Sequence, residues 1–324
     1  MRDNKICVIS AYFGKVPNYF PLWLKSCENN PEVDFLFVTD DVIAEHPSNV
    51  IVHKTTLEAV KSKASEILGF EASLERPYKM CDYKPMYGVL FADMLSQYDY
   101  WGHCDIDLIF GDLQHYFEKY DLYRYDRFLP LGHLSLYKNS EEINNRYKSE
   151  LLINNYIEVF SNDKSYIFDE IGGMTPFYAN SSYPFFKKRV FADIASIYER
   201  YRLIEEYIYD EKPKNYPKQI FLWENGKCYR EWMIGGKLFK EEYIYVHFKK
   251  RPNFKVEFDV KAVDAFYITK FGFVPKAQIT DQEIIQKLNP YEGKLHEFKE
   301  FARFKSLKYI RKLKGKIKRG IQTD

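Results

Sequence analysis

Short apolar runs that end in polar residues recur along the first part of the chain. Residues 5–14 and 33–41 each have the pattern of a buried strand, the first running into a glycine loop and the second ending in acids. Residues 21–27, between them, carry apolar side chains at helical spacing. Strand, helix and strand in this order predict a βαβ unit, whose ligand site lies at the carboxyl ends of its strands. Residues 10–15 and 39–41 are therefore expected to face one crevice.

The pattern predicts further elements along the rest of the chain. A third short strand is expected at 50–53, and a helix at 55–68 capped by Thr55 or Thr56. Pro85 suits the first turn of a helix that runs to about Leu95. The remaining expected elements are paired strands at 127–131 and 133–138, an irregular helix at 141–160, a helix at 181–203, a hairpin at 221–232 that turns at Asn225-Gly226, and a late strand at 242–251.

The most informative stretch is 98–112, where an aromatic run is followed by Asp105 and Asp107 and then by a helix start. Side chains two apart on a strand point the same way, so the two carboxylates converge while Ile106 faces the core. Converging carboxylates repel each other unless a proton or a cation lies between them. Mg²⁺ or Mn²⁺ suits such oxygen ligands and neutralises the charge of a leaving diphosphate. The plain alternative is that Asp105 caps a turn and Asp107 is solvated.

Polar residues at other strand ends form a candidate binding site for a nucleotide-linked donor substrate. Asp40 has the chemistry to accept a hydrogen bond from a base edge or a ribose hydroxyl, or it is a turn or helix-cap residue. The loop of Tyr12 to Gly14 lets backbone approach a nucleotide, but it lacks the Gly-x-Gly-x-x-Gly fingerprint of dinucleotide folds. Lys84 is a candidate for a phosphate or a sugar hydroxyl, or forms an exposed capping pair with Asp82. The donor-binding candidates are Ser10, Tyr12, Phe13, Gly14, Asp40, Lys84, Lys249, Lys250 and Arg251.

Two later segments add candidates for the reaction itself. Asp169 and Glu170 follow an aromatic run and precede a double glycine, where one of them is a candidate base for an acceptor hydroxyl. The alternative is a solvated loop, and a retaining enzyme would not need this base. His247 ends the late strand and is a candidate third metal ligand through its imidazole, or an ordinary satisfied polar residue. The cations of residues 249–251 follow it and suit a diphosphate.

Composition sets the limits on the kind of protein. With 324 residues, 46% of them hydrophobic, the chain can bury a full core, as one large domain or one domain with an appendage. Aromatic residues make up 18%, which suits stacking on bases or sugar rings and equally suits a Tyr-rich core. Five scattered cysteines without a Cys-x-x-Cys pair predict a reducing compartment and argue against a zinc site or a disulfide framework. No apolar run reaches the length of a membrane span, so a cytoplasmic location is expected.

Charge is unevenly distributed along the chain. The net charge is +2, yet residues 299–319 hold ten Lys or Arg against Glu300. Within 298–321, apolar residues recur every three or four positions, which predicts a basic amphipathic helix on the anionic inner face of the cytoplasmic membrane. Packing on the domain or on another protomer, or a disordered basic tail, are the alternatives. Few polar hydrogen-bonding residues lie between the cations, so no nucleic-acid partner is expected.

Five motifs occur together in this chain: Tyr78-Lys79-x-Cys81-Asp82-Tyr83-Lys84-Pro85-x-Tyr87-Gly88, Tyr100-Trp101-Gly102-His103-Cys104-Asp105-x-Asp107-x-Ile109-Phe110-Gly111, Gly132-His133-x-x-Leu136-Tyr137-Lys138-Asn139, Phe168-Asp169-Glu170 and Val246-His247-Phe248-x-Lys250-Arg251. In these motifs the chain resembles a bacterial glycosyltransferase-like family whose members often lie in capsule, O-antigen or exopolysaccharide gene clusters. The resemblance covers about residues 5–252. It implies a GT-A type fold, a nucleotide-diphospho-sugar donor and a divalent metal at Asp105 and Asp107. In related enzymes a late histidine supplies a further ligand, which is the role implied for His247.

These observations favour an α/β chain with a GT-A-like (Rossmann-like) mixed sheet flanked by helices and a C-terminal helical appendage. We expect a catalytic domain over 1–252 and an extension over 253–324. The expected function is metal-dependent transfer of a sugar from a nucleotide-diphospho-sugar to a saccharide or lipid-linked saccharide in surface polysaccharide synthesis. A nucleotidyltransferase or phosphohydrolase would use the same paired acids, and a non-catalytic scaffold of a polysaccharide assembly complex would use only the basic tail.

Overall fold

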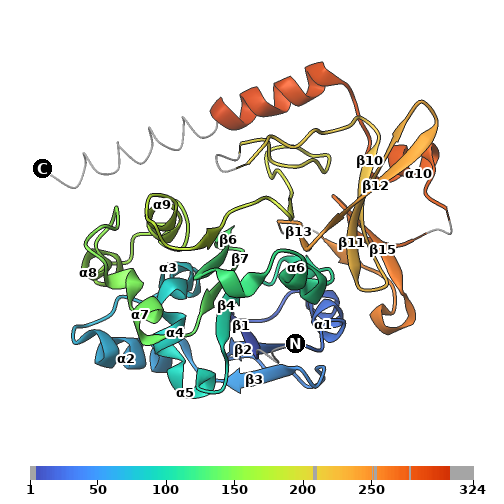
Figure 1. Ribbon diagram of the computed structural model, residues 1–324. Coiled ribbons are helices and arrows are strands. Elements are labelled where there is room, and N and C mark those ends of the chain that lie inside the picture. Colours follow the sequence, from blue (N-terminus) through green and yellow to red (C-terminus); the bar gives the residue numbers. More distant parts are fainter. Residues whose placement is uncertain (1–4, 207–209, 250, 252–253, 277–278, 307–324) are drawn as a thin grey trace, which may run out of the picture.

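The computed structural model describes residues 5–206, 210–249, 251, 254–276 and 279–306 (Figure 1). Its strands form three sheets, and helices cover both faces of the largest one. A further helix at 294–306 follows near the end of the described chain. The expected α/β class, a mixed sheet flanked by helices with a C-terminal helix, is confirmed.

The largest sheet has the strand order β3-β2-β1-β4-β7-β6-β8. Its strands are β1 Ile6–Ala11, β2 Val33–Thr39, β3 Val50–Lys54, β4 Tyr100–Cys104, β6 Arg127–Leu131, β7 Leu134–Lys138 and β8 Phe185–Phe186. Strands β3, β2, β1 and β4 run parallel, β7 is antiparallel to β4 and β6, and β8 is parallel to β6. The predicted βαβ unit and the predicted strand pair around Gly132 therefore belong to one sheet.

Alternating side chains explain why both faces of this sheet are covered. On β1, Ile6 and Val8 enter one apolar core, and Cys7 and Ile9 enter the other. The first core takes side chains from α1 Phe20–Glu28 and α6 Leu113–Lys119. The second takes side chains from the helices on the opposite face, which are α2 Leu57–Leu68, α3 Met80–Tyr83, α4 Tyr87–Leu90, α5 Ala92–Leu95, α7 Glu141–Asn144, α8 Tyr156–Phe160 and α9 Met174–Ala179.

Several helix boundaries differ from the predicted ones. The single helix expected around Pro85 is a succession of short turns, because proline removes a backbone donor. One 3-10 segment, Pro77–Lys79, precedes α3, and another, Lys84–Met86, lies between α3 and α4. Helix α2 begins as expected, with Thr56 accepting a hydrogen bond from the amide of Ala59. In the irregular helix expected at 141–160, the helical parts are α7, a 3-10 turn at Arg146–Lys148 and α8, and residues 149–155 are not helical. Further 3-10 turns lie at Leu122–Arg124 and Val260–Ala262.

The helix predicted for 181–203 is wrong. This segment contains β8 and β9 Ala192–Asp193, and Ile194 forms a bridge with Leu203. Phe191 lies in the core beneath the large sheet, whereas Ala192 and Ile194 lie in a neighbouring core. The segment passes between two apolar cores, so tertiary packing rather than helical periodicity decides its conformation.

The other two sheets follow the large one. A three-stranded sheet has the order β5-β13-β9, with β5 Leu108–Phe110 and β13 Tyr245–His247. A six-stranded sheet has the order β12-β11-β10-β15-β16-β14, and Figure 1 shows it beside the α1 and α6 face. Its strands are β10 Gln219–Glu224, β11 Lys227–Ile234, β12 Lys237–Tyr243, β14 Lys255–Val256, β15 Ala265–Thr269 and β16 Gly272–Pro275. The predicted hairpin at Asn225-Gly226 is confirmed as β10–β11.

The six-stranded sheet contains strands from both sides of the domain boundary expected after residue 252. Strands β14, β15 and β16 follow that position, yet β15 pairs with β10 and shares a core with it. Residues 255–275 therefore extend the sheet that begins at Gln219, and the helices of the C-terminal part are α10 Gln282–Leu288 and residues 294–306.

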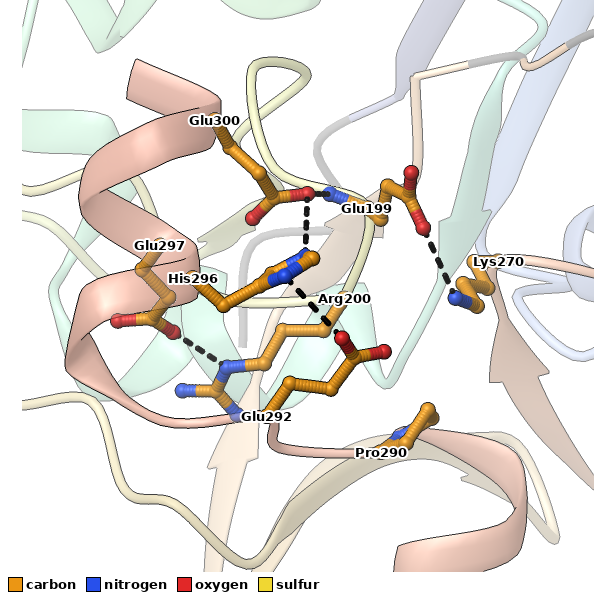
Figure 2. A pocket seen from close by; sticks show the side chains of 8 residues that line it. All are labelled: Glu199, Arg200, Lys270, Pro290, Glu292, His296, Glu297 and Glu300. Atoms are coloured by element: carbon orange, nitrogen blue, oxygen red, sulfur yellow. Dashed lines mark hydrogen bonds and ion pairs between the residues drawn. The ribbon is translucent and has the colours of Figure 1, made fainter. Parts of the chain in front are cut away.

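The helix at 294–306 is fixed to the body by ion pairs (Figure 2). Glu297 contacts Arg200 at 2.6 Å and Arg202 at 2.7 Å, and both arginines are at most 9% exposed. Glu300 accepts a hydrogen bond from the amide of Glu199 at 2.9 Å. On this helix, Leu295 and Phe298 are exposed. The part of the predicted amphipathic helix at 307–321 lies outside the described residues, and within the described chain no helix has the length and apolar character to cross a bilayer.

Candidate functional site

The two paired carboxylates lie where β4 of the large sheet continues into β5 of the three-stranded sheet. The amide of Asp105 donates to the carbonyl of His133 at 3.1 Å, and the carbonyl of Asp107 accepts from the amide of Phe248 at 3.2 Å. Ile106, between them, is only 6% exposed and lies in the core. Backbone pairing on both sides therefore fixes a short connection whose two carboxylates face away from the core, as the alternation predicts.

His247 joins the carboxylates because β13 pairs with β5. The antiparallel register places His247 opposite Leu108, next to Asp107. Its Nε2 lies 3.6 Å from Oδ1 of Asp107. Asp105, Asp107 and His247 each offer a ligand atom, and these atoms all lie within 4.8 Å of one another. Carboxylate oxygens and an imidazole nitrogen suit Mn²⁺ and Mg²⁺, so the donor set fits the expected metal.

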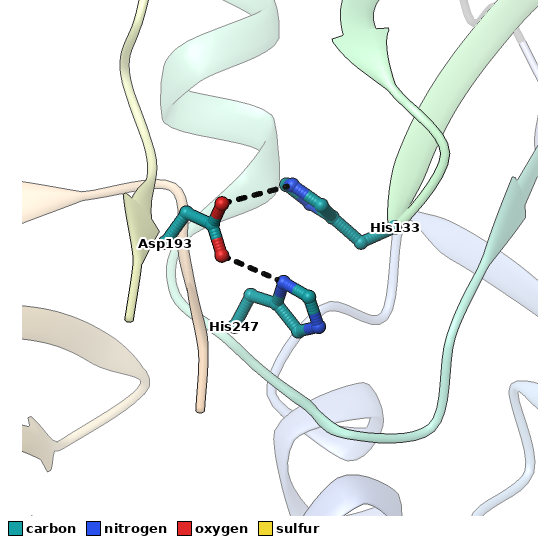
Figure 3. A group of neighbouring side chains, drawn as sticks. All are labelled: His133, Asp193 and His247. Atoms are coloured by element: carbon teal, nitrogen blue, oxygen red, sulfur yellow. Dashed lines mark hydrogen bonds and ion pairs between the residues drawn. The ribbon is translucent and has the colours of Figure 1, made fainter. Parts of the chain in front are cut away.

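The second nitrogen of His247 is held by a buried carboxylate, Asp193 (Figure 3). Nδ1 of His247 lies 2.9 Å from Oδ1 of Asp193, and β9 and β13 pair these two residues directly. Burial disfavours the imidazolium, but Asp107 and Asp193 outweigh it and raise the pKa of His247 to about 10. Burial alone would raise the pKa of Asp193, yet the hydrogen bond from His247 and the charge of Lys249 lower it well below its usual range.

A cavity of about 470 Å³ opens in front of the three candidate ligands. It lies at the carboxyl ends of β1 and β4, where a parallel α/β sheet binds its ligands. Its wall contains the expected donor residues Ser10, Tyr12 and Phe13 together with Lys84. It also contains residues for which no role was expected, namely Ala11, Tyr19, Pro77, Tyr78, Met80, Cys81, Tyr87, Cys104 and Ile106.

Lys84 lies inside the cavity wall rather than in an exposed capping pair. Its Nζ donates to Asp105 at 2.6 Å and to the carbonyl of Gly132 at 2.8 Å, and lies 3.4 Å from Asp169. Burial disfavours its ammonium, but Asp105 and Asp169 outweigh it and hold the pKa of Lys84 well above its usual value. Lys84 therefore compensates carboxylates at the edge of the metal ligands. Asp82, its expected capping partner, instead pairs with Lys79 at 3.0 Å.

Asp169 and Glu170 lie behind Lys84 and are not among the residues that line the cavity. Asp169 is 3% exposed, and burial raises its pKa while Lys84 opposes that shift. Glu170 accepts a hydrogen bond from the amide of Gly132 at 2.8 Å. A Cβ on Gly132 would lie 2.0 Å from Oδ2 of Asp169, so only glycine lets the two carboxylates approach this loop. The structure thus places both residues against the β6–β7 connection.

The remaining described donor candidates, Gly14, Asp40, Lys249 and Arg251, are not among the residues that line the cavity, and they have partners of their own. Asp40 accepts a hydrogen bond from the amide of Gly14 at 2.7 Å, which braces the loop that carries Tyr12 and Phe13. Lys249 pairs with Asp193 at 3.1 Å. Arg251 donates to the carbonyl of Ala195 at 3.2 Å. Lys250 lies outside the described residues.

Asp193 is the site residue that the sequence pattern should have revealed. It follows the apolar residues 190–192, which is the same pattern of an apolar run and an acid that marks the ends of other strands. The helix expected for 181–203 concealed that signal. Tyr19 and Tyr78 carry no comparable signal, because only the fold brings their segments to the cavity.

Comparison with known proteins finds similar solved structures and one matching sequence family. No curated protein sequence matches the chain. Among solved structures, mouse xyloside xylosyltransferase 1 in its apo form has a TM-score of 0.36 at 11% identity, over 59% of this chain and 88% of that one. The glycosyltransferase GlyE of Streptococcus pneumoniae TIGR4 has a TM-score of 0.33 at 14% identity, over 57% and 45%. The galactosyltransferase LgtC, in complex with donor and acceptor sugar analogs, has a TM-score of 0.30 at 10% identity, over 49% and 66%.

A sequence family covers most of the chain and contains every described residue of the cavity and of the three-ligand group. The family described as "Family of unknown function (DUF6625)" matches residues 8–277. The chain therefore belongs to the DUF6625 family.

Proposed function

We propose that this protein is a metal-dependent glycosyltransferase of GT-A-like architecture that uses a nucleotide-diphospho-sugar donor. The observation that carries the proposal is the group of Asp105, Asp107 and His247 at the cavity of about 470 Å³. A nucleotide sugar is of the size that such a cavity encloses in part. The acceptor we propose is a saccharide or lipid-linked saccharide of bacterial surface polysaccharide synthesis.

The charge balance of the cavity supports the metal. Among the described residues that line it, Lys84 is the single Lys or Arg, and Asp105 and Asp169 compensate its charge. Asp107 adds a further negative charge to the wall. A cation bound to Asp105 and Asp107 would offset their charge and attract an anionic diphosphate. Asp105, Asp107 and His247 would hold Mn²⁺ or Mg²⁺, which supplies Lewis-acid stabilisation of the departing diphosphate.

The aromatic wall supports a nucleoside or sugar ring beside the metal ligands. Tyr12 and Phe13 lie on the loop after β1, and Tyr19 and Tyr78 complete the described aromatic lining with Tyr87. Tyr78 is 68% exposed although it belongs to the cavity wall. A large exposed ring at a cavity edge provides a flat surface on which a base or a sugar ring can stack. We assign the donor to the aromatic wall of the cavity and the acceptor to its open side.

The role of Asp169 follows from its contact with Lys84. We propose that Asp169 helps to keep Lys84 charged and in place, since the two side chains lie 3.4 Å apart and both are buried. The base expected at Asp169 or Glu170 stays a prediction. Replacing Glu170 with Gln tests it, because the amide oxygen keeps the hydrogen bond from Gly132 but no longer takes up a proton.

The C-terminal segment supports contact with a membrane that carries a lipid-linked acceptor. Leu295 and Phe298 are exposed on the described helix, and residues 299–319 carry the excess of Lys and Arg. Exposed apolar side chains beside many cations favour an anionic lipid surface. We therefore propose peripheral binding to the cytoplasmic leaflet through 298–321.

The test is donor binding followed by analysis of the slow cleavage products. Melting temperatures are measured with UDP-, GDP- and dTDP-sugars, with and without Mn²⁺, for the wild type, for Asp105→Asn/Asp107→Asn and for the exposed control Asp93→Asn. One nucleotide is expected to raise the melting temperature of the wild type and the control only with Mn²⁺, and the double variant is expected not to respond.

The products separate the proposal from its rivals. A transferase that hydrolyses its donor slowly breaks the bond between sugar and phosphate and releases a nucleoside diphosphate. A nucleotidyltransferase or phosphohydrolase breaks the bond within the diphosphate and releases a nucleoside monophosphate. Release of monophosphate would overturn the proposal, and the absence of any nucleotide response would favour the scaffold.

A further inference from the structure

Three buried polar residues, His133, Asp193 and Tyr245, lie on the far side of His247 together with the half-buried Lys249. Figure 3 shows His133 and Asp193 beside His247. Asp193 is 6% exposed and His133 is 3% exposed. A buried carboxylate is costly unless it is hydrogen-bonded and compensated. Packing alone therefore does not explain why these polar residues are buried beside the three-stranded sheet.

Strand pairing places this cluster on the Nδ1 side of His247. Strand register pairs Asp193 with His247 across β9 and β13, and Leu108 with His247 across β13 and β5. The imidazole is thus held between two strands, with Nδ1 2.9 Å from Asp193 and Nε2 3.6 Å from Asp107. With Nδ1–H donating to Asp193, a metal ion on the side of Asp105 and Asp107 would displace the proton on Nε2 and bind the lone pair of that nitrogen.

The surroundings of Asp193 keep its carboxylate ionised and in place. Lys249 compensates it at 3.1 Å, and Nε2 of His133 lies 4.0 Å from its Oδ2. The hydroxyl of Tyr245 lies 2.7 Å from Nδ1 of His133, which fixes that ring in turn.

We propose that Asp193 is a positioning residue for the metal site, which acts by orienting His247 and fixing its Nδ1–H tautomer, with Lys249 as its counter-ion. The inference rests on the proposed function, because it assigns a role within that metal site. It also explains why His133, Asp193 and His247 lie together: the cluster supports the ligand from behind, and Asp105 and Asp107 complete the site in front.

The experiment measures Mn²⁺ affinity directly, by the electron paramagnetic resonance signal of free Mn²⁺ during titration of the metal into full-length protein. Asp193→Ala is expected to weaken Mn²⁺ binding by about 10- to 100-fold, the usual effect of losing a partner behind a metal ligand. Asp193→Asn keeps an oxygen that can accept the Nδ1–H bond and is expected to lose less. Asp93→Asn, on an exposed carboxylate paired with Lys63, is the matched control and is expected to bind as the wild type does.

A double-mutant cycle decides whether Asp193 acts through His247. His247→Ala alone should weaken Mn²⁺ binding, and Asp193→Ala should then have no further effect in the His247→Ala background. Melting curves in EDTA verify that each variant is folded, and Asp193→Asn carries the test if Asp193→Ala is not. Equal Mn²⁺ affinity of the folded Asp193 variants and the wild type, or additive losses in the cycle, would overturn the inference alone. A wild type that binds no Mn²⁺ would overturn the proposed metal site itself.

Discussion

At the scale of single residues, the site depends on how buried charges are compensated. Lys84 is 5% exposed and contacts Asp105 and Asp169, and Asp193 is compensated by Lys249. Such pairs add little net stability, but removing one member leaves an uncompensated charge in the interior. The residues of the site are thus coupled to the stability of the fold.

Replacing Lys84 with Met is expected to destabilise the protein by roughly 3–5 kcal/mol, since it leaves the carboxylates of Asp105 and Asp169 facing each other without a cation. Urea denaturation at pH 7 measures the change. Lys63→Met, which removes an exposed pair with Asp93, is the control and should cost no more than about 1 kcal/mol. Equal losses of unfolding free energy for the two variants would show that the buried ion pairs contribute no more than the exposed one.

Cys81 provides a reporter of the cavity. Burial, together with Asp105 and Asp169 and against the charge of Lys84, raises its pKa to about 12. The reactive thiolate is therefore scarce at neutral pH, and the rate of labelling by iodoacetamide should rise about tenfold per pH unit up to at least pH 10. Mass spectrometry measures labelling at Cys81, with Cys81→Ser as the blank. A plateau near pH 8 to 9 would indicate an ordinary, exposed thiol.

At the scale of elements, short strands do most of the positioning. β5, β9 and β13 are three, two and three residues long, yet their pairing places Asp107, Asp193 and His247 side by side. Strands this short are held by the cores on either side rather than by their own hydrogen bonds. The helix at 294–306 is a contrasting case, because Glu297 attaches it through charge.

Replacing Glu297 with Ala is expected to release that helix, because Arg200 and Arg202 would lose their shared counter-ion. Amide hydrogen exchange over 294–306 should accelerate roughly tenfold or more while the large sheet keeps its protection. Glu283→Ala, in the first turn of α10, is the control. Unchanged exchange in the Glu297 variant would mean that apolar contacts alone hold the helix.

At the scale of the whole molecule, catalysis and membrane contact are proposed for different parts of the chain. The cavity and its ligands come from residues 10–247, whereas the basic excess lies in 299–319. The two activities should therefore be separable by truncation.

A chain that ends at residue 306 is expected to bind Mn²⁺ and its nucleotide as the full chain does, but to lose sedimentation with anionic vesicles. The removed segment contains seven of the ten cations in 299–319, and each contributes about 1 kcal/mol near an anionic surface. Neutral vesicles and high salt are the controls, since both should weaken binding of the full chain. Vesicle binding that survives truncation would place the membrane contact elsewhere.

The sequence by itself determined the local structure and the first two candidate metal ligands. Alternation and apolar runs are local signals, so the strands of the βαβ unit, the hairpin at Asn225-Gly226 and the outward-facing pair of Asp105 and Asp107 could be predicted. Tertiary structure decided the rest. The partners of Lys84, the place of Asp169 behind it and the support of His247 by Asp193 depend on segments 21 to 85 residues apart. Contacts between such distant segments cannot be predicted from local sequence, because strand pairing and the packing of the two cores form them only when the whole chain folds.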